Sequence, residues 1–466
     1  MIWRKLMIQS IRRFLTSPAF LLIPFLIALA GLCGNWKILL ISMIINAQIV
    51  AFILFFSDDL LPAFLTAFCV ITLGATNLES LNDFVPYIPV TVTVVAGFIF
   101  HMIHYRRPIY IGKSFYGLVA TSAAVLLSGI ATPLATRDYT SLAAVYHIIG
   151  LSVGLILLYL LFAFNRREDR GYDPMQYFLW SMFYLGLLCA AVIFSEFLQW
   201  LIQAIDKGKS LRAYIFEYTN GFTYRNTIAT LLIMCFPAAF YLAKQRKRLL
   251  AQLFFMLSAL LLFGAIVLSS ARTAWLCGIV LLFLCFGYYL YKNPFRIGKY
   301  IAPLLFLLLC ALCIYPIRVP LLAILRSRLS QGLINPNEAR IVLISRSFRD
   351  FLAHPLFGVG ISSTINADVY SNKGCICWYH MYFPQLWGSM GLLGVGTYLY
   401  QLFVRAKLIL ADHSSEGTAL GLIYLGLFLY SQTDVGEFAP IPYAVITVLL
   451  FVLLEKKPKK DALPTE

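Results

Sequence analysis

Arginines and a histidine framed by aromatic residues are concentrated in one long polar stretch, residues 318–384. Arg340 opens a segment with helical periodicity and several further arginines, and the stretch ends in Trp378-Tyr379-His380-Met381-Tyr382. Arginine binds phosphate oxygens bidentately and keeps its charge in a partly dry site. A neutral histidine accepts a hydroxyl proton near pH 7, and the neighbouring rings can stack on sugars. The stretch therefore predicts a site that holds an anion and moves a proton.

Two more arginines lie outside this stretch, at other breaks between apolar runs. Arg272 stands in Leu268-Ser-Ser-Ala-Arg272-Thr-Ala-Trp, and Arg225 stands in Tyr224-Arg225-Asn226-Thr227. An arginine beside a tryptophan at such a break is equally typical of an anchor at the membrane interface. A lone histidine is likewise more often structural than catalytic. The position of all these groups at one predicted surface favours the functional interpretation.

Composition places the chain in the membrane. Hydrophobic residues make up 61% and charged residues 12% of the 466 positions, whereas soluble domains contain about 25% charged residues. The net charge of +16 comes mostly from short basic runs between apolar spans. Such runs are typical of cytoplasmic loops and do not form the basic face that nucleic acid requires.

The apolar runs predict an all-α polytopic membrane protein with about 12–14 transmembrane helices, each of about 20 residues. The runs are 14–34, 38–56, 60–76, 86–103, 114–131, 143–164, 176–201, 226–243, 250–269, 273–291, 300–317, 385–404, 416–431 and 438–454. With both termini in the cytoplasm, every basic run such as 244–248 and 405–407 is cytoplasmic, and the loop 318–384 lies outside. Its excess of arginine predicts an anionic partner there.

The same reading divides the chain into five parts. These are N-terminal transmembrane helices (1–225), central helices carrying the Ser-Ala-Arg motif (226–317), the large extracytoplasmic loop (318–384), C-terminal helices (385–455) and a basic cytoplasmic tail (456–466).

Other chemistry has little support in the residues. No phosphate-binding glycine loop, dinucleotide-binding pattern or Asp-x-Asp metal motif occurs in the outward loops, so neither cofactor nor metal is expected. Ionisable residues are almost absent from the span centres, which argues against an ion-coupled pump. Asp434 and Glu437, three residues apart at the predicted outer face, could be a second base or a metal pair, but carboxylates with this spacing in a loop are usually solvated. Two classes of protein remain as interpretations: an enzyme, and a protein that moves or binds lipids without ion coupling.

Three segments together resemble the signature of the O-antigen ligase and polymerase superfamily. They are Leu268-Ser-Ser-Ala-Arg272-Thr-Ala-Trp, Arg340 with Pro355-Leu-Phe-Gly358-Val-Gly360, and His380-x-x-x-Pro-Gln-Leu-Trp-Gly-Ser-Met-Gly391-Leu-Leu-Gly394. The resemblance runs from about 225 to 405. Ile344 and Met381 stand where the family commonly has Trp and Asn.

The resemblance implies an all-helical (GT-C-like) membrane glycosyltransferase of the bacterial cytoplasmic membrane. It would move an oligosaccharide from undecaprenyl diphosphate to a glycan or lipid acceptor outside the cytoplasm, as a ligase or a polymerase. Arg272 and Arg340, with Arg225 as a weaker match, would bind the diphosphate, and His380 would activate the acceptor hydroxyl. A lipid-linked oligosaccharide flippase and a non-catalytic partner of an envelope assembly remain alternatives.

Overall fold

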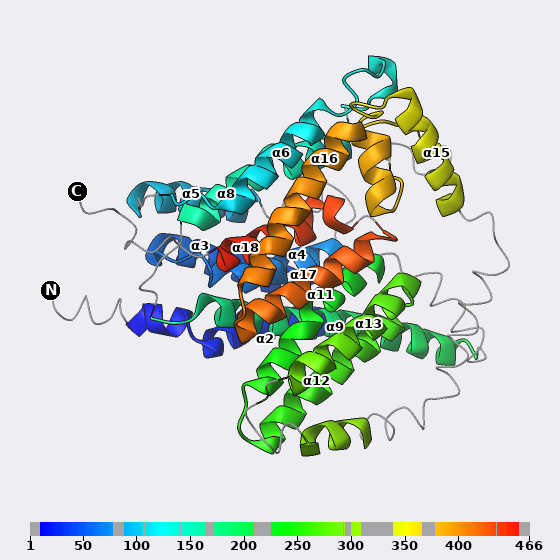
Figure 1. Ribbon diagram of the computed structural model, residues 1–466. Coiled ribbons are helices and arrows are strands. Elements are labelled where there is room, and N and C mark those ends of the chain that lie inside the picture. The colour runs from blue at the N-terminus through cyan, green and yellow to red at the C-terminus, as the bar shows by residue number, and fades with distance from the viewer. Residues whose placement is uncertain are drawn as a thin grey trace, which may run out of the picture. The chain divides into compact units, whose positions relative to one another are not determined.

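A computed structural model describes residues 10–77, 88–105, 109–139, 141–164, 171–208, 225–291, 293, 300–308, 339–365, 378–434 and 436–455. Within these ranges the chain is helical apart from turns, loops and one isolated β-bridge between Arg137 and Ser363 (Figure 1). Six of the described helices are long and apolar enough to cross a membrane. The predicted all-α membrane architecture is confirmed.

The predicted spans coincide with helices wherever the chain is described. The runs at 86–103 and 300–317 extend beyond the described residues. Five further apolar helices are shorter than 18 residues, so the number of transmembrane helices stays a prediction.

The chain forms two compact units, and each combines separate stretches of sequence. The first unit contains residues 1–106 and 169–334, and the second contains residues 107–168 and 335–466. The five predicted parts follow one another along the chain, whereas each compact unit combines residues from several of these parts. The large loop 318–384 is divided between them at residue 334.

The first unit is a bundle built around one fully enclosed helix, α11. Its helices are α2 (Pro18–Cys33), α3 (Trp36–Phe56), α4 (Ala63–Asn77), α5 (Ile88–His104), α9 (Pro174–Asp206), α11 (Arg225–Lys244), α12 (Leu249–Leu268) and α13 (Arg272–Leu290). Every residue of α11 from Ile228 to Lys244 is buried, and α9, α12 and α13 pack against it. Gly186 of α9 lets the backbones approach, because a Cβ there would lie 2.8 Å from Cys235 Cβ.

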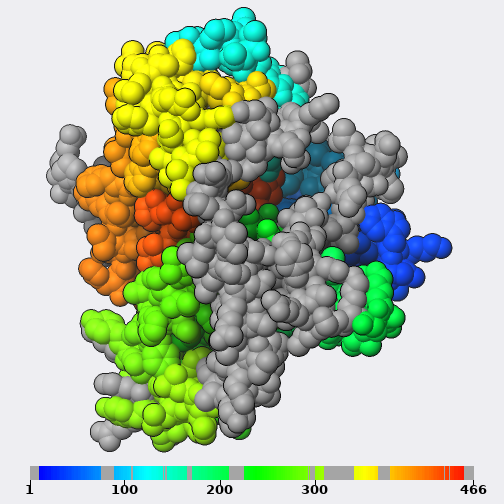
Figure 2. All heavy atoms as spheres, turned by 90° about the vertical axis from the view of Figure 1, so that its right-hand side faces the viewer, coloured from blue at the N-terminus to red at the C-terminus, as the bar shows by residue number. Residues whose placement is uncertain are grey.

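The second unit contains the histidine and the loop segments around it. Its elements are α6 (Lys113–Leu127), η2 (Leu134–Thr136), α7 (Leu142–Ile149), η3 (Gly150–Gly154), α8 (Leu155–Phe164), α15 (Ala339–Ala353), α16 (Tyr382–Ala411), α17 (Ser415–Ser431), η4 (Gly436–Phe438), η5 (Pro440–Ala444) and α18 (Val445–Leu454). Helices α6 and α15 both pack on α16. Atoms of α15 form the yellow area in Figure 2.

Helix α16 is broken near its start. Gly391 has a positive φ of 63° inside the assigned helix, a conformation that glycine adopts at little cost. The predicted span 385–404 is therefore two pieces, a short segment 382–390 and a longer helix 392–411. The longer piece alone has the roughly 30 Å length of a membrane crossing.

A loop following α15 fills this break. Gly358 and Gly360 in this loop also have positive φ angles. Backbone hydrogen bonds join the two segments: Val359 N–H to Gly388 O (3.0 Å), Gly360 N–H to Ser389 O (2.9 Å), Leu392 N–H to Pro355 O (2.8 Å) and Leu393 N–H to Leu356 O (3.1 Å). The glycine motifs noted in the sequence thus fix α15 against α16 by direct backbone contact.

We expect alanine at Gly391 to destabilise the second unit. A Cβ there would lie 2.6 Å from the Pro355 carbonyl oxygen, at a φ that disfavours side chains, and such strain costs about 1–3 kcal/mol before any clash is counted. Gly396, also in α16, has no atom within 4 Å of a built Cβ and serves as the control. Thermal unfolding in detergent should show a lower midpoint for Gly391→Ala and an unchanged or higher one for Gly396→Ala. Equal midpoints would contradict the packing described here.

Candidate functional site

Arg225 and Arg272 begin two helices of the first unit that run in the same direction. Arg225 is the first residue of α11, and Arg272 is the first residue of α13. At the opposite end, the Lys244 ammonium of α11 donates hydrogen bonds to the carbonyls of Tyr288 (3.0 Å) and Tyr291 (2.7 Å), where α13 ends. Because the helices have nearly equal lengths and their C-terminal ends meet, both arginines lie at the same end of the unit.

The polar break before α13 is a tight turn that presents Arg272. Ser270 has a φ of 60°, and the Ala271 N–H donates to Ser269 Oγ at 3.4 Å. The Trp275 indole N–H donates to the Val267 carbonyl at 2.9 Å, which ties α13 back to the end of α12. The Arg272 side chain is exposed at this corner. The local sequence therefore folds to place a guanidinium at a helix start.

Arg340 occupies a comparable place in the second unit, as the second residue of α15. Thus each predicted diphosphate-binding arginine lies in the first turn of the helix that carries it. The first turn has unpaired N–H groups and the positive end of the helix dipole, and both attract phosphate. A guanidinium at that position adds a charged, bidentate donor.

His380 is held at the mouth of α16 with a carboxylate at its side. Its φ of 54° is unusual for a residue other than glycine, and such strain is often found at functional sites. The imidazole Nδ1 lies 3.4 Å from Asp434 Oδ1. Asp434 Oδ2 accepts a hydrogen bond from the Tyr430 hydroxyl at 3.1 Å. If Nδ1 carries the proton, Nε2 has the free lone pair of a base.

The three aromatic residues around His380 differ in exposure. Trp378 is partly exposed, and its ring packs edge-on against that of His147 in α7, with centroids 5.0 Å apart. Tyr379 and Tyr382 are 0% exposed. Their burial argues against the predicted stacking of these two tyrosines on a sugar, because neither presents a ring face. The stacking role of Trp378, which is partly exposed, stays a prediction.

Tyr379 instead ties the histidine to α15. Its hydroxyl donates to Asp350 Oδ2 at 2.5 Å, and its backbone N–H donates to Gln385 Oε1 at 2.9 Å. Burial raises the pKa of the Asp350 carboxyl, and the hydrogen bond from Tyr379 opposes this rise. A second link joins the Trp387 indole N–H to Ser347 Oγ at 2.9 Å. The helix that carries Arg340 is thereby fixed to the segment that carries His380.

Asp434 and Glu437 are buried, contrary to the expectation that they are solvated. Both are 7% exposed. Glu437 Oε2 accepts a hydrogen bond at 2.8 Å from Arg405, whose guanidinium also donates to the Tyr424 hydroxyl at 3.0 Å. The sequence predicts Arg405 in a cytoplasmic run, whereas in the structure it is buried within α16. It lies six positions before the end of the helix, which is about 9 Å along the helix axis.

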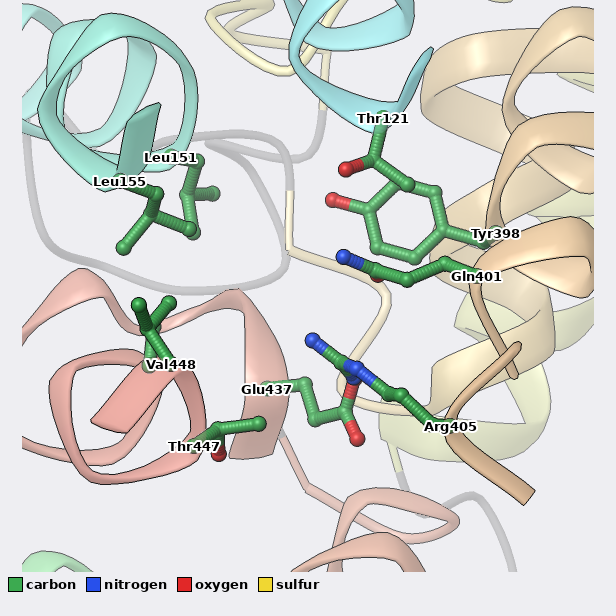
Figure 3. A pocket seen from close by; sticks show the side chains of 10 residues that line it. Thr121, Leu151, Leu155, Tyr398, Gln401, Arg405, Glu437, Thr447 and Val448 are labelled. Carbon is green, nitrogen blue, oxygen red and sulfur yellow. The ribbon is translucent and has the colours of Figure 1, made fainter. Parts of the chain in front are cut away.

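A small cavity adjoins this ion pair, with Leu151, Leu155 and Val448 lining one side of it (Figure 3). Its volume is about 20 Å³, and its lining includes Thr121, Tyr398, Gln401 and Thr447. Glu437 Oε1 has no hydrogen-bond partner among the described residues. The volume is enough for about one water molecule. Arg405 and Glu437 directly border the predicted spans 385–404 and 438–454, so the pair does not test the prediction that ionisable residues are almost absent from the span centres.

Residues predicted on the same side of the membrane meet within each unit. On the predicted cytoplasmic side, Glu455 accepts hydrogen bonds from the Ser114 N–H (2.6 Å) and the Tyr159 hydroxyl (2.7 Å). On the predicted outer side, Gly129 donates to the Phe357 carbonyl at 2.9 Å, and His380 meets Asp434. These contacts agree with the alternation of spans read from the sequence, whereas the contact between Arg405 and Glu437 joins residues predicted on opposite sides.

Comparison with known proteins gives one family match. Residues 257–399 match the family described as O-antigen ligase (Wzy_C). This region includes Arg272, Arg340 and His380 with its aromatic neighbours, whereas Arg225 and Asp434 lie outside it. No curated protein and no solved structure matches the chain.

Proposed function

We propose a transferase function for this protein, because residues 257–399 match the O-antigen ligase family. Members of this family are bacterial inner-membrane enzymes of surface polysaccharide assembly. It moves an oligosaccharide from undecaprenyl diphosphate to a glycan or lipid acceptor outside the cytoplasm, without a metal. The product is either a glycan attached once, as by a ligase, or a growing polymer.

The pair of His380 and Asp434 is the observation that carries this proposal. The carboxylate beside Nδ1 favours the tautomer in which Nε2 is unprotonated, and it stabilises the imidazolium that forms when Nε2 accepts a proton. Nε2 takes the proton of the acceptor hydroxyl while the hydroxyl oxygen bonds to the anomeric carbon of the donor. The bond between that carbon and the phosphate oxygen breaks, and its electron pair leaves with the diphosphate.

The arginines at the helix starts match the charge of the leaving group. Charge develops on the diphosphate as the bond to the sugar breaks, and fixed donors aimed at that charge lower the barrier. Arg272 and Arg340 would bind the phosphates, and Arg225, which lies at the same end of the first unit as Arg272, would assist them. The energy of the reaction is already stored in the lipid-linked donor, so no nucleotide is needed outside.

The flippase alternative receives no support from the cavity beside Arg405 and Glu437. A flippase needs a charged passage wide enough for a glycan, whereas this cavity of about 20 Å³ holds about one water molecule. The pair of His380 and Asp434 also has no role in simple transport.

A reconstituted transfer assay tests the proposal. Purified protein in liposomes receives undecaprenyl-diphosphate oligosaccharide from the host together with candidate acceptors, and the products are separated on a gel. A ladder of repeats identifies a polymerase, and a single addition identifies a ligase. Absence of any product across the glycan and lipid acceptors of the host would contradict the proposed function.

We expect Arg272→Ala and Arg340→Ala to lower the transfer rate in this assay by about 10²–10³-fold each, the typical cost of removing one preorganised donor from a developing charge. Arg248→Ala is the matched control, since Arg248 is exposed at the start of α12 on the predicted cytoplasmic side. Equal rates for the Arg272 and Arg248 variants would argue against the diphosphate role.

A further inference from the structure

Helix α15 has one face committed to packing. Leu343 and Ser347 are 0% exposed, and the links from Ser347 to Trp387 and from Asp350 to Tyr379 fasten this face to the α16 segment. These residues recur at spacings of three and four, so they form a single stripe along the helix. The opposite face is left for another partner.

The opposite face is a stripe of large apolar side chains. Its members are Ile341 (61% exposed), Ile344 (42%), Phe348 (55%) and Leu352 (63%), and Leu356 (59%) follows just after the helix. From Ile341 to Leu352 the stripe is about 16 Å long. Moving such side chains out of water is favourable. A stripe of this length therefore favours an apolar environment.

The helix cannot cross the bilayer to find that environment. It has 15 residues, or about 22 Å of length, against the 30 Å of a hydrocarbon core. It also carries Arg346, Arg349 and Asp350, whose charges are costly at the membrane centre. A short helix with one apolar and one charged face lies in the plane of the membrane interface instead.

The charges of α15 complement anionic lipid headgroups. Three arginines, Arg340, Arg346 and Arg349, stand against one aspartate, and Arg349 is exposed at the border of the apolar stripe. An anionic lipid surface attracts arginine side chains that lie close to it.

We propose that α15 lies in the plane of the outer leaflet, with Ile341, Ile344, Phe348 and Leu352 among the acyl chains. One consequence rests on the proposed function: Arg340, at the start of the helix, lies at the depth of the lipid phosphates. The diphosphate of the lipid-linked donor would then be bound without leaving the headgroup layer.

Site-specific photocrosslinking of the full chain tests the location of the stripe. The photoreactive residue p-benzoylphenylalanine replaces Phe348, and the protein is placed in nanodiscs of phosphatidylethanolamine and phosphatidylglycerol. After irradiation, mass spectrometry should find a phospholipid adduct at position 348. Ala353, exposed on the polar side of α15, is the negative control and should give at least about tenfold less adduct, the ratio for a 1.4 kcal/mol preference.

Phe403, 66% exposed on the long segment of α16, is the positive control. A lipid adduct at 403 without one at 348 would overturn the proposal. A crosslink from 348 to a peptide of this chain or of a second copy would overturn it too, since the stripe would then be a protein contact. Crosslinking requires no activity, so failure of the transferase proposal would be seen separately, in the transfer assay.

Discussion

Replacing His380 with alanine is expected to lower transfer by about 10²–10⁴-fold, the usual contribution of a positioned general base. The variant should insert and fold like the wild type, because the imidazole is 26% exposed and alanine leaves no buried cavity of the size that a core substitution creates. The assay is the reconstituted transfer reaction, with the unfolding midpoint measured on the same preparation. His413→Ala, which changes an exposed histidine on the predicted cytoplasmic side, is the control.

Asp434→Asn separates the function of the pair from that of the histidine alone. Asparagine keeps the size of the side chain but loses the charge that stabilises the imidazolium, so activity should fall by less than in His380→Ala and should change its dependence on pH. Normal product from His380→Ala would remove the base from the mechanism. Normal product with an unchanged pH profile from Asp434→Asn would leave Asp434 with a structural role.

The helical spans could be predicted because the bilayer sets their length. A run such as 226–243 must be helical to satisfy its backbone in lipid, and the structure has α11 at Arg225–Lys244. The break at Gly391 could not be predicted in this way. Apolar residues flank it on both sides, so hydropathy shows one continuous run. The break depends on hydrogen bonds to a loop about 35 residues earlier, which only the folded chain reveals.

Residue type and place are enough to make His380 and the arginines candidates, but they give the partner of the histidine little weight. The spacing of Asp434 and Glu437 is common in loops and predicts solvated carboxylates. Its role depends on the turn from Ser431 to Glu437, where the Glu437 N–H donates to Ser431 Oγ at 3.1 Å. That turn brings a residue 54 positions away to His380, a contact that no local pattern encodes.

Replacing Arg405 with alanine is expected to destabilise the second unit by about 3–5 kcal/mol, since it leaves the buried Glu437 carboxylate without its counter-charge. Thermal unfolding in detergent should show the loss. Arg405→Lys should be intermediate, because a lysine keeps the positive charge but lacks the planar, rigid guanidinium that holds its donors toward Glu437 and Tyr424. An unfolding midpoint for Arg405→Ala equal to that of the wild type would show that the pair is open to water.

The double variant Arg405→Leu/Glu437→Leu distinguishes stability from positioning. Replacing both members of a buried ion pair with apolar residues is often neutral or stabilising, so much of the lost stability should return. Glu437 and Asp434 share one turn, and the ion pair fixes that turn to α16. If the pair sets the position of Asp434 beside His380, the double variant should regain its stability while transfer remains low. Recovery of both would limit the ion pair to a role in folding.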